Sequence, residues 1–405
     1  MTKDKQDREV ECRDCHGVNS PGSRYCWYCG ARLPRVHLGL FGGAPYMRIG
    51  ALLIKWLFSL GLVAAIAYGL YYTAERLVFP LFTSSTTEMA DTTPTTPPYA
   101  EETSSTTTTE PMRINTVPAG EDRYVTAIAV SQLNFPMGAR SVVLVSGESY
   151  EHALCVAPLA ATYEGPILLV PPSGLRSDLE AELKRLDPVQ VLLVGVPKAK
   201  TVTARLKDLL DKPEVTTITG EDAYHTSVLV AQALAATQES LAGVVVVPSD
   251  DFLEAVAVAP LAAVNKWPML LARRDAKLPS RATSFLEENM VTSALVVGTA
   301  TKLSLPTVET ISEADPFATA AAVVSYASRH GLSFRHTCIA TGDSFADPLV
   351  VAPCLAPDGG TLLLARNGEL PTGFATLFES NRAQIRTLDI IGLPALAERL
   401  AQNLP

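Results

Sequence analysis

The chain has 405 residues, of which 47% are hydrophobic and 19% are charged, a composition that excludes a mostly disordered protein. Its length favours about two to four folding units. The formal net charge of −9 and the acidic isoelectric point near 5.3 argue against general nucleic-acid binding. Seven cysteines are too few for a disulfide scaffold, and four of them lie within residues 12–29, so the chain consists of unlike parts.

Two closely spaced cysteine pairs mark residues 8–35. Four thiolates in two C-x-x-C pairs form the tetrahedral shell that Zn²⁺ prefers. Because protein ligands fill all four positions, the ion would be structural. A redox C-x-x-C is the alternative, which the proximity of the two pairs makes weaker. The segment resembles the zinc ribbons of many prokaryotic membrane proteins. We therefore expect one Zn²⁺, held in a reducing compartment by Cys12, Cys15, Cys26 and Cys29.

An apolar stretch follows at residues 49–73. Residues 56–72 contain no charge, and together with residues 49–54 they are long enough to cross a hydrocarbon core of about 30 Å. A buried core helix is the alternative. Residues 1–55 hold nine Lys or Arg and five acids, whereas Arg76 is the only base between the span and Arg113. The positive-inside rule therefore predicts a single-pass protein of the cell membrane, with a cytoplasmic N-terminus and an extracellular remainder.

Residues 83–111 have a strongly biased composition. They contain twelve Thr, four Ser and four Pro, and neither Lys nor Arg. Such a segment buries too little apolar surface to fold, so we expect a disordered stalk outside the membrane. Its composition leaves O-glycosylation open.

Residues 112–405 repeat internally. The phrase Gly120-Glu121-Asp122-x-Tyr124-x-Thr126 recurs at residues 220–226, and a weaker copy reads Asp315-x-Phe317-x-Thr319. The phrase Ala157-Pro158-Leu159-Ala160 returns at residues 259–262 and, altered, at residues 352–355. Since these markers keep their order, we expect three repeats, spanning residues 112–220, 221–312 and 313–405.

Helical and strand-like segments alternate within the first repeat. Helical spacing covers residues 124–133, 151–163, 178–186 and 203–210, and short apolar runs cover residues 141–145, 166–170 and 191–194. Strands without polar alternation, separated by helices, indicate a parallel sheet covered on both faces. Each repeat is therefore predicted to be one compact α/β domain. The three domains either pack around a pseudo-threefold axis or string out.

The repeats resemble the cell wall-binding repeat 2 family of Gram-positive surface proteins. The phrase Asp122-Arg123-Tyr124-Val125-Thr126-Ala127 reproduces the opening of a family repeat. The turn Thr341-Gly342-Asp343-Ser344-Phe345-Ala346-Asp347 matches a second family motif, and residues 146–154 and 249–255 match it more loosely. The resemblance covers about residues 113–405. It implies three tandem Toprim-like α/β domains that attach noncovalently to anionic cell-wall polymers.

Acidic side chains recur in the turn after the first apolar strand of each repeat. They are Glu148, Asp250, Asp251, Asp343 and Asp347. Open α/β sheets bind ligands at the carboxyl ends of their strands, so these acids are candidates to hold a cation or a sugar hydroxyl. The alternative is that they cap the helices that follow.

Arg123 is a further candidate for ligand binding, but it is not repeated. The second and third repeats have Ala223 and Pro316 at this position. His152 likewise replaces the acid that the other repeats carry as Glu254 and Asp347. If these positions contact the polymer, the three repeats are not equivalent.

These features together predict a membrane-anchored, non-enzymatic surface protein whose extracellular repeats bind a cell-wall polysaccharide or anionic wall polymer. Its other partners would be the lipid bilayer and a cytoplasmic protein. No serine-hydrolase, zinc-protease or phosphate-loop motif occurs in the sequence. The alternatives are a wall-modifying hydrolase that uses the turn acids, and an envelope sensor or assembly protein. Residues 56–405 hold 24 bases and 37 acids, so an anionic polymer would require a local basic groove, bridging cations or sugar hydrogen bonds.

Overall fold

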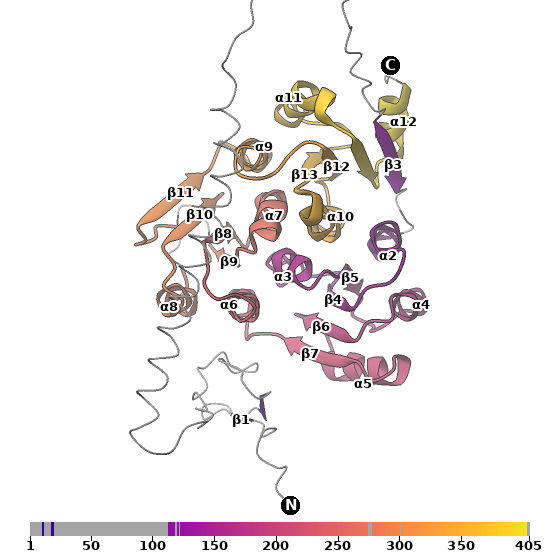
Figure 1. Ribbon diagram of the computed structural model, residues 1–405, viewed down its shortest axis with the longest axis vertical. Helices are drawn as coiled ribbons and strands as arrows, with labels where there is room; N and C mark the ends of the chain where they lie inside the picture. Colours follow the sequence, from indigo (N-terminus) through magenta and orange to yellow (C-terminus); the bar gives the residue numbers. More distant parts are fainter. Residues whose placement is uncertain are drawn as a thin grey trace, which may run out of the picture. The chain divides into compact units, whose positions relative to one another are not determined.

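The computed structural model describes residues 10–11, 18–19, 112–117, 120, 122–273, 278–299 and 301–402 (Figure 1). Near the N-terminus, β1 (Val10–Glu11) and β2 (Val18–Asn19) pair antiparallel. The four cysteines of the predicted zinc ribbon, the predicted span at 49–73 and the predicted stalk at 83–111 lie outside the described residues. Within the described ranges, every helix is too short or too polar to cross a bilayer.

The first repeat forms a four-stranded parallel sheet with strand order β5-β4-β6-β7. Its strands are β4 (Ser141–Ser146), β5 (Ile167–Val170), β6 (Gln190–Val194) and β7 (Glu214–Ile218). Its helices are α2 (Arg123–Asn134), α3 (Ala157–Thr162), α4 (Ser177–Leu186) and α5 (Ala199–Leu209). The helix predicted over residues 151–163 begins only at Ala157. Pro158 lies in its first turn, where a missing N–H removes no helical hydrogen bond.

The second and third repeats keep this strand order. The second consists of α6 (Ala223–Ala235), β8 (Val244–Pro248), α7 (Leu253–Asn265), β9 (Met269–Ala272), α8 (Ser280–Glu288), β10 (Ser293–Val297) and β11 (Thr307–Ile311). The third consists of α9 (Pro316–Ala327), β12 (His336–Thr341), α10 (Ala346–Val351), η2 (Ala352–Asp358), β13 (Thr361–Ala365), α11 (Thr372–Asn381), η3 (Arg382–Gln384), β14 (Thr387–Ile391) and α12 (Pro394–Gln402).

The fourth strand of the third sheet comes from the far end of the repeat region. β3 (Arg113–Val117) precedes the first repeat in sequence, yet it pairs in parallel with β14. β7 and β11 hold the equivalent edge positions in the first and second sheets. Each sheet thus ends on a strand that leads into the next repeat, and β3 closes the series between the third repeat and the first. The predicted first repeat, residues 112–220, therefore includes a strand of the third sheet.

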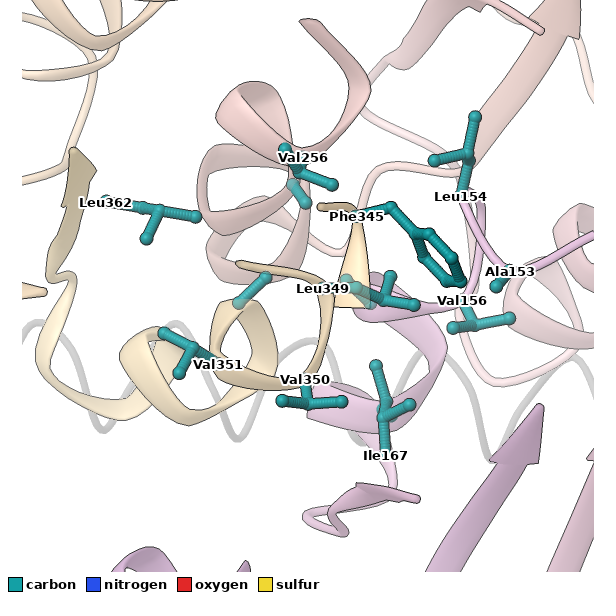
Figure 2. Packing of buried hydrophobic residues seen from close by; sticks show 14 of the residues in the cluster. Ala153, Leu154, Val156, Ile167, Val256, Phe345, Leu349, Val350, Val351 and Leu362 are labelled. Carbon is teal, nitrogen blue, oxygen red and sulfur yellow. The ribbon is translucent and has the colours of Figure 1, made fainter. Parts of the chain in front are cut away.

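The three repeats share one hydrophobic core. Helix α3, helix α7 and the α10–η2 segment contact one another between the three sheets (Figure 1). Figure 2 shows side chains from all three repeats, among them Val156, Val256 and Leu349, packed together. This cluster runs through all three sheets. The three α/β units therefore pack around a common centre rather than stringing out, and they are fused rather than separate compact domains.

Candidate functional site

Three aromatic side chains bring the predicted acidic turns together. Tyr150, Phe252 and Phe345 follow β4, β8 and β12 at equivalent positions of the three repeats. Their ring centroids are 5.8 to 6.4 Å apart, and each ring contacts the other two. The turns after the first strand of each repeat therefore meet at one place, at the carboxyl ends of the parallel strands.

The turn acids at this place make separate contacts. Glu148 accepts a hydrogen bond from Tyr124 Oη at 2.6 Å, and Asp343 accepts one from the Asn367 backbone N–H at 2.8 Å. Asp251 accepts one from the backbone N–H of Leu253 at 3.0 Å, at the start of α7. Asp251 thus caps the helix that follows it, whereas Glu148 and Asp343 bond to residues outside their own turns. Glu148, Asp250 and Asp343 are exposed.

Binding of a cation was one function predicted for these acids. Among the residues that the structure describes, no three or more His, Cys, Asp or Glu side chains are grouped so as to hold a metal ion. The exposed carboxylates are hydrogen-bond acceptors, and sugar hydroxyls can donate to them.

The acids that open each repeat are helix caps. Asp122 accepts from the backbone N–H groups of Tyr124 and Val125 at 3.0 and 2.9 Å, at the start of α2. Asp222 accepts from the backbone N–H of His225 at the start of α6, and Asp315 accepts from those of Phe317 and Ala318 at the start of α9. The recurrence of the Asp-x-aromatic phrase therefore reflects helix capping.

Arg123 lies between the first and third repeats. Its Nη1 donates to the carbonyl of Gly147 at 2.7 Å, and its Cζ lies 5.4 Å from the centroid of the Phe345 ring. Ala223 and Pro316, at the equivalent positions, can form neither contact. Arg123 thus supports the junction at which β3 closes the series of repeats, and its side chain is partly buried there.

Asp347 differs from the other candidate acids because it is largely withdrawn from water. It lies in the first turn of α10, packed against Gly392 at the end of β14, where a Cβ would lie 2.6 Å from Asp347 Oδ2. Burial raises the pKa of Asp347 to about 6, against the opposing effect of Arg123. The equivalent pairs are His152 with Gly195 and Glu254 with Gly298. Asp347 therefore belongs to the packing between elements rather than to the exposed turns.

Two arginines beside these turns were not among the residues predicted from the sequence. Arg176, which follows β5, lies over the ring of Tyr124, with Cζ 5.2 Å from the centroid. Arg366, which follows β13, lies over Phe317 at 5.3 Å. The sequence holds a signal that could have identified them, because an arginine follows the second strand of every repeat. In the second repeat this is Arg273, after β9. Cationic groups thus accompany the acids at this edge of the first and third sheets.

The chain is a tandem-repeat protein. Its three α/β units have the same strand order and share one core, and β3, which precedes the first repeat, completes the third sheet. The sequence model of the cell wall binding domain 2 (CWB2) family matches residues 118–201 and 217–308, which lie in the first two repeats.

Two solved structures share the fold. Cwp6 from Clostridium difficile superposes with a TM-score of 0.65 and 22% identity over 72% of this chain and 48% of its own. Cwp8 from the same organism gives a TM-score of 0.61 and 21% identity over 73% of this chain and 52% of its own.

Two curated relatives come from Bacillus subtilis (strain 168). N-acetylmuramoyl-L-alanine amidase LytC is 29% identical over 294 residues, which are 70% of this chain and 57% of LytC. The amidase enhancer is 31% identical over 163 residues, which are 40% of this chain and 22% of the enhancer. The chain thus spans little more than half the length of LytC and less of the enhancer.

Proposed function

We propose that this chain is a membrane-anchored surface protein that holds a cell-wall polymer noncovalently through three extracellular repeats. The family match over two repeats, together with a third sheet of the same strand order, is the observation that carries the proposal. The polymer would lie across the turns that follow β4, β8 and β12. There Glu148, Asp250, Asp251 and Asp343 supply acceptors for sugar hydroxyls, while Arg123 and Asp347 hold the junction beneath them.

The anchor in this proposal is the apolar segment at residues 49–73, with the N-terminus in the cytoplasm and residues 83–111 as a disordered stalk. On the cytoplasmic side, Cys12, Cys15, Cys26 and Cys29 would hold one structural Zn²⁺. The antiparallel pair β1 and β2 supports this, because the two strands flank the first cysteine pair as the arms of a knuckle. The resulting ribbon is the surface to which a cytoplasmic protein would dock.

The repeats act without catalysis in this account. The name of LytC is the argument for a wall-modifying hydrolase, but the match leaves 43% of that protein uncovered. If the repeats were hydrolases, the full chain would release soluble fragments from purified walls, and Glu148→Gln, Asp250→Asn or Asp343→Asn would abolish that release. We expect no release by the unaltered chain.

Fractionation of cells that express the full chain tests anchoring and wall binding together. The control is a variant that ends at residue 111 and so keeps the ribbon, the span and the stalk. After detergent has dissolved the membranes, the full chain should remain with the walls, and the control should be extracted. Complete extraction of both proteins would contradict wall binding. A control protein found in the soluble fraction before detergent is added would contradict the anchor.

A further inference from the structure

Arg366 is held in a defined position at the carboxyl end of β13. The two residues that follow it, Asn367 and Gly368, have φ values of 50° and 76°. The Arg366 N–H donates to the carbonyl of Glu369 at 2.7 Å, and the Glu369 N–H donates back at 3.0 Å. This is a two-residue Asn-Gly hairpin turn, which fixes the backbone at Arg366. From α12, Arg399 Nη2 donates to the Gly368 carbonyl at 2.9 Å, which ties the turn to the third sheet.

The side chain of Arg366 is exposed, and an aromatic ring supports it. Its Cζ lies 5.3 Å from the centroid of Phe317, at a distance where a guanidinium and a ring attract each other. Gly342 leaves room for this ring, because a Cβ there would lie 2.8 Å from Phe317 Cε1. The hairpin and the ring together restrict a guanidinium that would otherwise sample many rotamers.

The first repeat also has an arginine over its opening aromatic ring, but acids neutralise that arginine. Arg176 lies over Tyr124 in the same way, but its guanidinium also forms ion pairs with Asp122 and Asp178. In the described part of the chain, no carboxylate forms an ion pair with Arg366. Asp315, the counterpart of Asp122, caps α9 as Asp122 caps α2, but it forms no ion pair with Arg366. The charge of Arg366 is thus available to a ligand, whereas that of Arg176 is already compensated.

A hydrogen-bond acceptor for hydroxyl groups lies next to this cation. The exposed carboxylate of Asp343 accepts from the backbone N–H of Asn367, the residue that follows Arg366. One turn therefore presents a restrained guanidinium, which binds anionic oxygens, and a carboxylate, which accepts from hydroxyls. A sugar that bears a phosphate or a carboxylate has both groups.

We propose that Arg366, supported by Phe317, is the anion-binding point for the wall polymer, and that the third repeat rather than the first provides it. This inference rests on the function proposed above. It explains how an extracellular region with 24 bases and 37 acids holds an anionic polymer without an overall positive field. The ligand is an acidic glycan segment, bound through its phosphate or carboxylate oxygens.

The test compares binding of the detergent-purified full chain, Arg366→Gln and Arg176→Gln to walls isolated from the organism that makes the protein. Arg176→Gln is the matched control, since it removes an arginine that also stacks on a ring. One ionic contact contributes about tenfold to affinity, so Arg366→Gln should bind about tenfold more weakly, and its binding should vary less with salt. The affinity of Phe317→Leu for walls should be about two- to fivefold lower, because the change removes the ring and keeps an apolar side chain. Arg176→Gln should bind as the unaltered chain does.

A second arm uses walls stripped of phosphate-linked polymers with hydrofluoric acid. Loss of Arg366-dependent binding there would assign a phosphate, and its persistence would assign a carboxylate. Binding by Arg366→Gln within twofold of the unaltered chain, or equal losses in the two arginine variants, would overturn the inference and leave the proposed function standing. If the unaltered chain did not bind walls at all, both would fall.

Discussion

The strand that closes the third sheet is held by a polar network around His336. His336 Nε2 lies 2.8 Å from Asp389 Oδ2 on β14, and its Nδ1 lies 3.0 Å from Asp358 Oδ2. Asp389 Oδ1 in turn accepts from Asn115 Nδ2, on β3, at 2.8 Å. A histidine that donates from both ring nitrogens is protonated. Burial opposes this charge, but the hydrogen bonds and charges of Asp389 and Asp358 outweigh it and raise the pKa of His336.

The change His336→Gln removes this cation from a nearly buried carboxylate. The side chains of His336 and Asp389 are 13% and 9% exposed, and a hydrogen bond to a charged group contributes about 1.5–3 kcal/mol. Because the pKa of His336 is raised on folding, its contribution is complete below the unfolded-state value of about 6.5 and is lost as the pH rises through the folded value. The variant should therefore lower the free energy of unfolding by about 1.5–3 kcal/mol near pH 5.5 and by clearly less near pH 8.5.

Urea unfolding of the full chain at both pH values measures this difference, and amide hydrogen exchange in β3 reports whether the loss is local to the closing strand. Asn115→Ala is the control, because it removes a bond to Asp389 without removing a titrating group. It should cost about 1.5–3 kcal/mol, and the same amount at either pH. An equal loss from His336→Gln at both pH values, or β3 exchange unchanged at the lower pH, would refute the reasoning.

Two further predictions concern Asp347 and the zinc ribbon. Burial raises the pKa of Asp347 to about 6, so the unaltered chain loses stability as the pH rises from the ordinary carboxyl value toward about 6. The free energy of unfolding of Asp347→Asn should therefore exceed that of the unaltered chain by about 1–3 kcal/mol near pH 7.5 and should equal it near pH 3.5. An equal increase at the two pH values would contradict this prediction. Atomic absorption should find one Zn²⁺ per chain, and none after Cys12→Ser combined with Cys26→Ser, while wall retention stays unchanged. Zinc retained by the variant would remove these cysteines from the ligand set.

The buried elements were predictable from the sequence because their signals are local. The apolar runs at 141–145 and 191–194 became β4 and β6 to within one residue, and the helical spacing at 124–133 became α2. β3, β7 and β11 were missed because threonines and charged residues interrupt their apolar pattern and most of their residues are exposed or half-buried. A signal was present, since a short β-branched segment precedes the opening phrase of every repeat.

Contacts between distant segments account for what the sequence did not predict. The pairing of β3 with β14 joins residues more than 270 positions apart, and no local pattern encodes it. The parallel-sheet rule placed Glu148, Asp250 and Asp343 correctly at strand ends. The burial of Asp347 arises from tertiary neighbours, and so does the contrast between Arg176, which forms ion pairs, and Arg366, which forms none with the described residues. Neither follows from the residues alone.

Co-sedimentation of the detergent-purified full chain with isolated walls tests the central claim most directly. Purified walls are mixed with the protein at increasing salt, and the bound fraction is measured alongside the variant that ends at residue 111. We expect saturable pelleting of the full chain, weakened by salt, with the truncated variant left in the supernatant. A full chain that stays in the supernatant with the variant at low salt would contradict wall binding by the repeats.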